Sequence, residues 1–317
     1  MSDSVVPSVS KHAGGRGGGR LLRDLRKNKF IYMMLIPIAL YYLVFHYYPM
    51  YGAQIAFRDF SPLKGIWGSA WVGFKHFSDF FSSYYFYRLL RNTVLINLYD
   101  IIFGFPAPII MAILINEIGH PLFKRTVQTI TYLPHFISLV VVCGLLTDFL
   151  ASDGVINNAI EFFGGKPTSF LMNPEAFRTI YVGSEIWQSM GWNSIVYLAA
   201  LVSIPSELYE AARIDGAGKM REIWSITIPC LIPTIVIMLI MRVGKIMTVG
   251  AEKIILLYNP SIYETADVIS SFVYRKGVLE ASFSFTAAVG LFNSIISFAM
   301  VASVNKLCNK LTQSSLW

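Results

Sequence analysis

Six long apolar segments dominate this chain of 317 residues. A helix needs about 20 residues to cross the hydrocarbon core of a bilayer, and each segment comes close to that length or exceeds it. Only 14% of the residues are charged, against about 25% in soluble domains. The sequence therefore predicts an all-α integral membrane protein with six transmembrane helices, not a soluble protein with a large core. The segments are approximately residues 30–48, 93–115, 127–150, 179–202, 226–250 and 282–305.

The distribution of lysine and arginine predicts the orientation, because cytoplasmic loops carry an excess of both. With the N-terminus inside, fourteen basic residues fall in the short cytoplasmic pieces and ten in the longer outer loops. Residues 1–29 are polar and basic and lack a signal-cleavage site. We therefore expect a flexible cytoplasmic arm (1–29), a six-helix transmembrane domain (30–305) and a cytoplasmic tail (306–317).

Prolines interrupt several of the apolar segments. Pro106 and Pro108 fall in the second segment, Pro134 in the third, and Pro229 and Pro233 in the fifth. A proline inside a helix removes a backbone hydrogen bond and kinks the helix. Freed carbonyls are tolerated at membrane depth where protein or a water-filled cavity surrounds them. The pattern is compatible with helices that line a pathway and also with ordinary membrane-helix packing.

A polar loop, residues 203–229, connects the fourth and fifth segments. It reads EAARIDGAGKMREIWSITIP from Glu210 to Pro229. Pro205 is a residue that begins helices, and Gly216 permits the positive φ of a sharp turn. The sequence predicts a short helix that ends near Ile214, a turn at Gly216 and a second short helix. With the orientation above, this elbow lies in the cytoplasm.

The same loop resembles the EAA loop of permease subunits of ABC importers. It has the sequence Glu-Ala-Ala, three residues, glycine, nine residues, isoleucine, two residues and proline. One position departs from the usual pattern, since Ile228 replaces a leucine. The resemblance implies that the loop docks on a separate ATPase subunit, and that coupling to ATP hydrolysis depends on Glu210, Ala211, Ala212, Asp215, Gly216 and Pro229.

Other stretches are similar to the maltose-type branch of these permeases, which imports carbohydrates. Trp71-Val72-Gly73-Phe74, Asn92-Thr93 and Tyr132-Leu133-Pro134 are of this kind. Five further stretches together resemble the subgroup that imports complex oligosaccharides and polysaccharide fragments. They are residues 257–260, 263–269, 274–277, 288–292 and 315–317.

The resemblance implies an assembly in a bacterial cytoplasmic membrane. Its other members would be a second homologous permease, two ATPase subunits and an extracytoplasmic sugar-binding protein. This chain contains no GxxxxGK[ST] phosphate loop, so ATP and Mg²⁺ are expected on the partner ATPase. We expect no catalytic residue, metal ligand or cofactor in this chain, and no nucleic-acid partner despite the net charge of +7.

Four ionisable residues lie inside the apolar segments: Asp100, Glu185, Arg242 and Lys245. Charged side chains at membrane depth are costly and often functional. At about 1.5 Å rise per residue, all four reach a similar level in the outer leaflet. We therefore expect them to pair with one another around a cavity.

A sugar site also needs amide groups and aromatic faces. Candidates for a substrate pathway are Gln188, Trp192, Asn193 and Tyr197 on the fourth segment and Asn293 on the sixth. The same polar groups could instead join helices to one another. Two further classes of protein stay open at this point, a secondary transporter driven by an ion gradient and a membrane scaffold without its own pathway.

Overall fold

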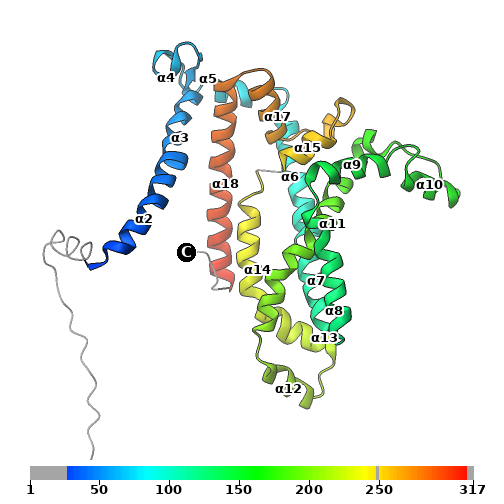
Figure 1. The fold of residues 1–317 in the computed structure, drawn as a ribbon. Coiled ribbons are helices and arrows are strands. Elements are labelled where there is room, and N and C mark those ends of the chain that lie inside the picture. The colour runs from blue at the N-terminus through cyan, green and yellow to red at the C-terminus, as the bar shows by residue number, and fades with distance from the viewer. Residues whose placement is uncertain (1–26, 248–249, 313–317) are drawn as a thin grey trace, which may run out of the picture. The chain divides into compact units, whose positions relative to one another are not determined.

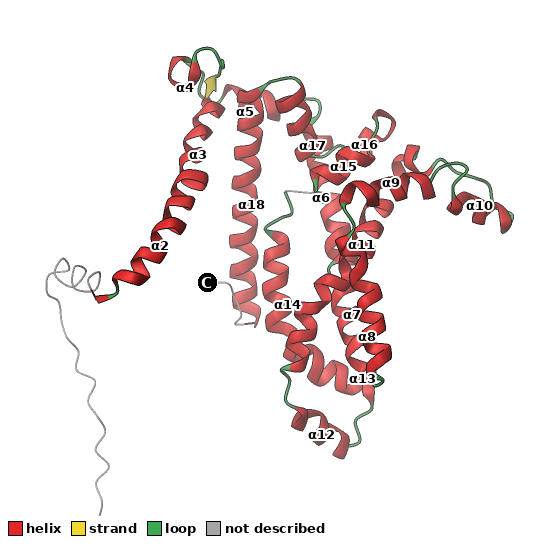
Figure 2. Ribbon diagram, in the orientation of Figure 1, coloured by secondary structure: helices red, strands yellow, loops and turns green. Residues whose placement is uncertain are grey.

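The structure is a computed structural model of the chain, and it describes residues 27–247 and 250–312. Packing divides the chain into two units, residues 1–54 and 55–317, which are described separately. Helices make up most of the described residues of both units (Figures 1 and 2). Residues 1–26 of the predicted arm and 313–317 of the predicted tail lie outside the described residues.

The first unit contains one long helical stretch, which ends in the second unit. Its elements are α2 (Lys29–Tyr42), the π-helix η1 (Leu43–Tyr47), α3 (Tyr48–Met50) and the 3-10 helix η2 (Tyr51–Phe57). Together they form 29 residues that are long and apolar enough to cross a membrane. This stretch agrees with the first predicted segment and extends it towards the C-terminus.

The second unit is also helical, apart from a short antiparallel pair of strands, β1 (Arg58–Asp59) and β2 (Ala70–Trp71). Its helical elements, in chain order, are α4 (Gly65–Gly68), α5 (Lys75–Phe81), α6 (Phe86–Tyr99), η3 (Asp100–Gly104), α7 (Pro106–Glu117), α8 (Pro121–Tyr132), η4 (Leu133–Phe136), α9 (Leu139–Phe149), α10 (Val155–Phe162), η5 (Phe170–Met172), α11 (Pro174–Val202), α12 (Ser206–Ile214), α13 (Lys219–Glu222), η6 (Ile223–Thr227), α14 (Ile228–Val243), α15 (Ala251–Leu257), η7 (Pro260–Ile262), α16 (Tyr263–Ala266), α17 (Ile269–Tyr274), η8 (Arg275–Leu279) and α18 (Phe283–Thr312).

By length and composition, four stretches among the described residues can cross a membrane alone, and up to six can if bent pairs count as one span. The four are Lys29–Phe57, Phe86–Glu117, Lys219–Val243 and Phe283–Lys310. The bent pairs are α8 to η4 with α9, bent by 98°, and α11 with α12, bent by 70°. The chain is thus an all-α protein with several candidate spans, and the number six stays a prediction.

Two predicted segments differ from the structure. The predicted segment 127–150 is not one straight helix, because α8 and η4 end at Phe136 and the chain bends by 98° before α9 begins at Leu139. The Ser138 side chain accepts a hydrogen bond from the Val141 amide and caps the new helix,. The predicted fifth segment, 226–250, is misplaced at both ends, since its helix begins at Lys219 and ends at Val243.

π-helical turns precede three of the prolines. η1 ends two residues before Pro49, η3 two residues before Pro106, and η6 two residues before Pro229. A proline ring collides with the carbonyl four residues earlier in an α-helix. A wider π turn moves that carbonyl, so each helix continues through its proline with a local irregularity.

Helix α11 lies at the centre of the second unit and packs against α7, α8 and α14 (Figure 1). Its contact with α8 is very close at Gly191, where an added Cβ would lie 2.0 Å from the Thr131 carbonyl oxygen. A buried apolar cluster that includes Ala112, Tyr197 and Leu231 joins α7, α11 and α14. This packing fixes the faces of α11 and α14, which carry Glu185 and Arg242, and of α7, which follows the η3 segment that carries Asp100.

Asp267 joins helices at the end of the unit opposite α12. Its buried carboxylate accepts hydrogen bonds from Arg275 at 2.7 Å and Arg88 at 3.3 Å. Burial opposes the charged form of Arg275, but the hydrogen bond and the charge of Asp267 outweigh it and raise the pKa of the guanidinium,. The cluster ties α6 to the segment between α16 and η8.

Candidate functional site

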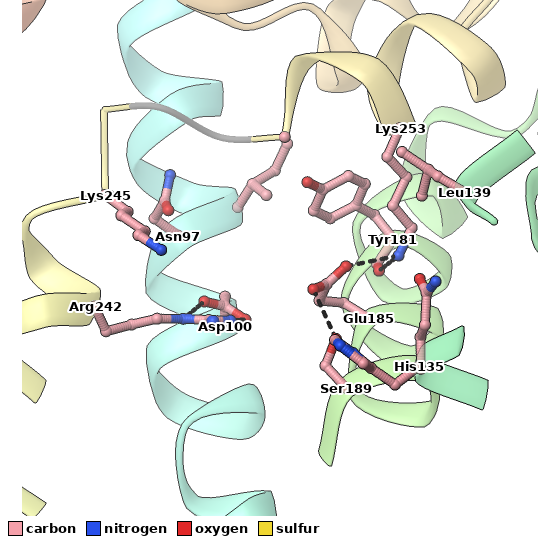
Figure 3. Close-up of a pocket in the computed structure, with 13 residues that line it drawn as sticks. Asn97, Asp100, His135, Leu139, Tyr181, Glu185, Ser189, Arg242, Lys245 and Lys253 are labelled. Atoms are coloured by element: carbon pink, nitrogen blue, oxygen red, sulfur yellow. Dashed lines mark hydrogen bonds and ion pairs between the residues drawn. The ribbon is translucent and has the colours of Figure 1, made fainter. Parts of the chain in front are cut away.

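A cavity of about 360 Å³ opens between α6 and η3, α11, and the chain that follows α14 (Figure 3). Its wall brings together Asp100 of η3, Glu185 of α11 and Arg242 of α14, and it also includes Lys245 just beyond α14. Polar side chains from other elements complete it. The lining residues are Ile96, Asn97, Asp100, His135, Leu139, Tyr181, Glu185, Gln188, Ser189, Arg242, Lys245, Gly250 and Lys253.

Asp100 and Arg242 form a two-pronged ion pair on one side of this cavity (Figure 3). The Arg242 Nε donates to Asp100 Oδ2 at 2.7 Å, and a terminal guanidinium nitrogen donates to Oδ1. Gly104 lies beside this carboxylate, where an added Cβ would come within 2.5 Å of Oδ1. The predicted pairing of charges from the second and fifth segments is confirmed for these two residues.

Glu185 has a different partner, which the sequence reasoning missed. Lys253 of α15 donates to Glu185 Oε2 at 3.1 Å and to the Tyr181 carbonyl oxygen at 3.3 Å. Lys253 lies outside the candidate spans, in the segment between α14 and α18, yet its side chain is only 2% exposed. The sequence feature that could have indicated this pairing is the lysine in the mostly apolar run AEKIILL, residues 251–257. Ser189 donates a further hydrogen bond to Glu185 at 3.2 Å.

A second cavity, of about 250 Å³, lies nearer to α12. Arg242 and Lys245 line both cavities. Lys245 lies in a turn just beyond α14, so its predicted place inside a continuous helix is wrong. The remaining residues of the second cavity come from the start of α7, from α11 and from α14, and they are Gly104, Phe105, Pro108, Asn193, Val196, Tyr197, Met238 and Met241.

The predicted sugar-site residues separate into three groups. Asn193 and Tyr197 share a face of α11 and line the second cavity, whereas Gln188 lines the first and donates to the Ile137 carbonyl oxygen. Trp192 lies outside the lining of both cavities and stacks on His135 at a ring separation of 4.6 Å. Asn293 joins elements instead, because its amide donates to the Met247 carbonyl oxygen at 2.8 Å.

The loop with the EAA spacing forms α12 and α13 around a turn at Gly216, whose φ is +77°. Glu222 is 3% exposed and accepts from Arg213 at 2.8 Å. Lys219 lies 3.4 Å from Glu222 and 2.8 Å from Glu117 at the end of α7. These ion pairs tie the loop to α7.

The other residues of the predicted coupling set lie on the same loop. Ala211 and Ala212 lie within α12, and Asp215 follows the helix directly. Glu210 lines a polar cavity between α12 and the end of α7. Pro229 is the second residue of α14. The docking role of these residues stays a prediction.

The chemistry of the first cavity is that of a binding surface. It presents three basic and two acidic side chains, an aromatic hydroxyl, amides and a hydroxyl group. Among the described residues no group of three His, Cys, Asp or Glu side chains could hold a metal ion. Paired charges, amides and hydroxyls on a cavity wall suit a polar solute that passes or binds.

Comparison with known families decides the class of protein. Residues 104–307 match the family described as binding-protein-dependent transport system inner membrane component. The chain belongs to this family. It is therefore a multi-pass membrane permease of a transport system and not an enzyme, which decides against the secondary-transporter and scaffold alternatives.

Similar proteins cover nearly the whole chain. "Protein LplB" of Bacillus subtilis (strain 168) is 42% identical over 92% of this chain and 92% of its own length. The polygalacturonan/rhamnogalacturonan transport system permease protein YteP of the same organism is 41% identical over 94% of this chain and 93% of its own.

Two solved structures are also similar to this chain over nearly its whole length. A chain of a bacterial ABC transporter that imports the acidic polysaccharide alginate is 44% identical, with a TM-score of 0.87, over 92% of this chain and 99% of its own. A chain of an alginate transporter in complex with an alginate pentasaccharide-bound periplasmic protein is 42% identical, with a TM-score of 0.88, over 94% of this chain and all of its own.

Proposed function

We propose that this chain is one of two permease subunits of an ATP-driven importer, and that its cargo is an acidic oligosaccharide or polysaccharide fragment. The observation that carries this proposal is the similarity, over more than nine-tenths of the chain, to permeases of polygalacturonan/rhamnogalacturonan and alginate transport. The fold is shared throughout that length, so the chain has room for the same kind of pathway.

The charges of the first cavity support an acidic cargo. Arg242, Lys245 and Lys253 outnumber Asp100 and Glu185 on its wall. A cavity with excess positive charge concentrates anions, and guanidinium groups bind carboxylates through paired hydrogen bonds. Gln188 and Asn97 supply amides of the kind that bind sugar hydroxyls.

The EAA-type loop is the proposed contact with the ATPase, in a cytoplasmic location. α12 presents the small residues Ala211 and Ala212, so a partner surface can come close to its backbone. The Arg213–Glu222 pair holds α12 to α13, and the Lys219–Glu117 pair holds α13 to the end of α7. A motion of the ATPase would then move α7 together with the loop.

The test uses the assembled importer, with its second permease, ATPase subunits and binding protein, in proteoliposomes. We expect ATP-dependent uptake of labelled oligouronates and little uptake of neutral oligosaccharides of equal length. Uptake of the neutral sugars alone would refute the acidic cargo. Uptake that persists without ATP hydrolysis would refute the proposed ATP-driven function.

A second arm tests the coupling loop. Glu210→Ala and Gly216→Pro should leave the subunit in the membrane and abolish the ATP hydrolysis that loaded binding protein stimulates. Glu280→Gln is a matched control, because this acid is exposed and pairs only with Lys276 among the described contacts. Normal stimulation in both loop variants would exclude the loop as the coupling element.

A further inference from the structure

The Asp100–Arg242 ion pair lies where the two cavities meet. Arg242 lines both cavities, as does Lys245, whereas Tyr181 and Glu185 line only the first and Tyr197 only the second. Tyr181 and Tyr197 are separated by about 24 Å of helix rise along α11. A solute that moves from one cavity to the other along this wall must therefore pass the ion pair.

The backbone that follows Asp100 is irregular. Asp100 is the first residue of the π-helix η3, and the following prolines Pro106 and Pro108 lack backbone donors. Gly104 has no side chain, and the Asp100 carboxylate takes up the space where a Cβ would lie, 2.5 Å from Oδ1. Short π-helical turns recur at functional sites, where the backbone hydrogen bonds are already irregular. A movement of Asp100 away from Arg242 would therefore take place where the helix is already irregular.

Separating the pair has a cost that depends on the solute. A neutral sugar offers only hydroxyl groups to Arg242, so the guanidinium would lose its charged partner inside a partly buried site. A sugar carboxylate offers the same planar pair of oxygens as Asp100 and replaces both hydrogen bonds. Lys245, on the same wall, adds positive charge beside the exchanged carboxylates.

We propose that the Asp100–Arg242 pair is a selectivity gate between the two cavities, which opens when a carboxylate of the sugar replaces Asp100 on Arg242. The proposal rests on the acidic cargo proposed above and makes Asp100 a specificity-determining residue. Neutral sugars are excluded because Asp100 keeps its hydrogen bonds to Arg242 in their presence. Acidic sugars pass because their carboxylate takes over those hydrogen bonds.

The experiment compares two forms of one cargo in the assembled importer, an oligogalacturonate and its fully methyl-esterified counterpart. Both are supplied at concentrations that saturate the binding protein. We expect the parent to take up the acidic form at least about tenfold faster than the ester. Asp100→Asn should raise the uptake of the ester relative to the acid by a similar factor, because a neutral amide at this position holds Arg242 less tightly than the carboxylate does.

Two control variants distinguish loss of the gate from general damage to the subunit. Asp100→Glu keeps the charge and should keep the parent's preference for the acidic form. Glu280→Gln removes an exposed acid away from the cavities and should also keep it. The binding protein is the same in every case, so its own preference cancels in the comparison.

A measurement on the parent alone covers the case in which Asp100→Asn fails to assemble. Binding protein loaded with the acidic form should stimulate ATP hydrolysis several-fold more than binding protein loaded with the ester. Equal stimulation, or equal uptake of the two forms by the parent, would overturn the gate while leaving the importer function intact. Uptake of neither form would instead refute the cargo class, and the gate with it.

Discussion

The pairing of charges inside the second unit makes a selective prediction about rescue. Arg242→Met removes the partner of Asp100, whose side chain is 13% exposed, and should destabilise the assembled subunit. Breaking a fully buried pair costs about 3–5 kcal/mol. Arg242 is 32% exposed, and water then compensates part of the loss, so we expect about 1–3 kcal/mol here.

Asp100→Asn should restore most of that stability when combined with Arg242→Met, because it removes the unpaired charge. Glu185→Gln should not, because Glu185 pairs with Lys253. The mirror experiment uses Lys253→Met, which Glu185→Gln should rescue and Asp100→Asn should not. Contacting pairs show coupling energies of about 0.5–3 kcal/mol in such cycles, and separated pairs add independently.

The assay is the free energy of unfolding in denaturant of the detergent-solubilised assembly, together with the fraction of assembled complex after gel filtration. Two outcomes would refute the reasoning. One is equal rescue of Arg242→Met by Asp100→Asn and Glu185→Gln. The other is an Arg242→Met variant as stable as the parent, which would mean that Arg242 reaches the membrane interface without using Asp100.

Three further predictions concern packing, coupling and orientation. Gly191→Ala should cost about 1–3 kcal/mol through overpacking against α8, whereas Gly183→Ala, with open space at its Cβ, should be tolerated; equal unfolding free energies would contradict the close contact. Glu222→Gln should lower the amount of sugar imported per ATP, because Arg213 and Lys219 lose a shared partner; an unchanged ratio in the uptake assay would exclude a role for these ion pairs. A cysteine at Ser169 should react with an impermeant thiol reagent added outside and one at Lys219 should not, and the opposite pattern would reverse the orientation.

The sequence alone determined the class of fold and the position of the short helix and turn in the loop 203–229. Long apolar segments have few other stable states in a bilayer, since helices satisfy every backbone group internally. The EAA spacing located a helix that the structure has at Ser206–Ile214 and a turn at Gly216, because both follow from local backbone preferences. The expected pairing of charges within the apolar segments was confirmed for Asp100 and Arg242, whereas Glu185 pairs with Lys253, which lies outside those segments.

The tertiary structure decided which charges pair and where the helices break. Depth along a helix does not determine the direction in which a side chain points, so Asp100 and Glu185 were equal candidates for Arg242 until α11 was packed against η3 and α14. Lys253 escaped prediction because the chain leaves α14 at Val243 and folds back as a short helix, a path that hydropathy does not encode. The 98° bend between η4 and α9, two residues beyond Pro134, is likewise not encoded in the hydropathy of the segment. Which charged side chains pair depends on which helix faces pack against one another, and only the folded chain brings those faces together.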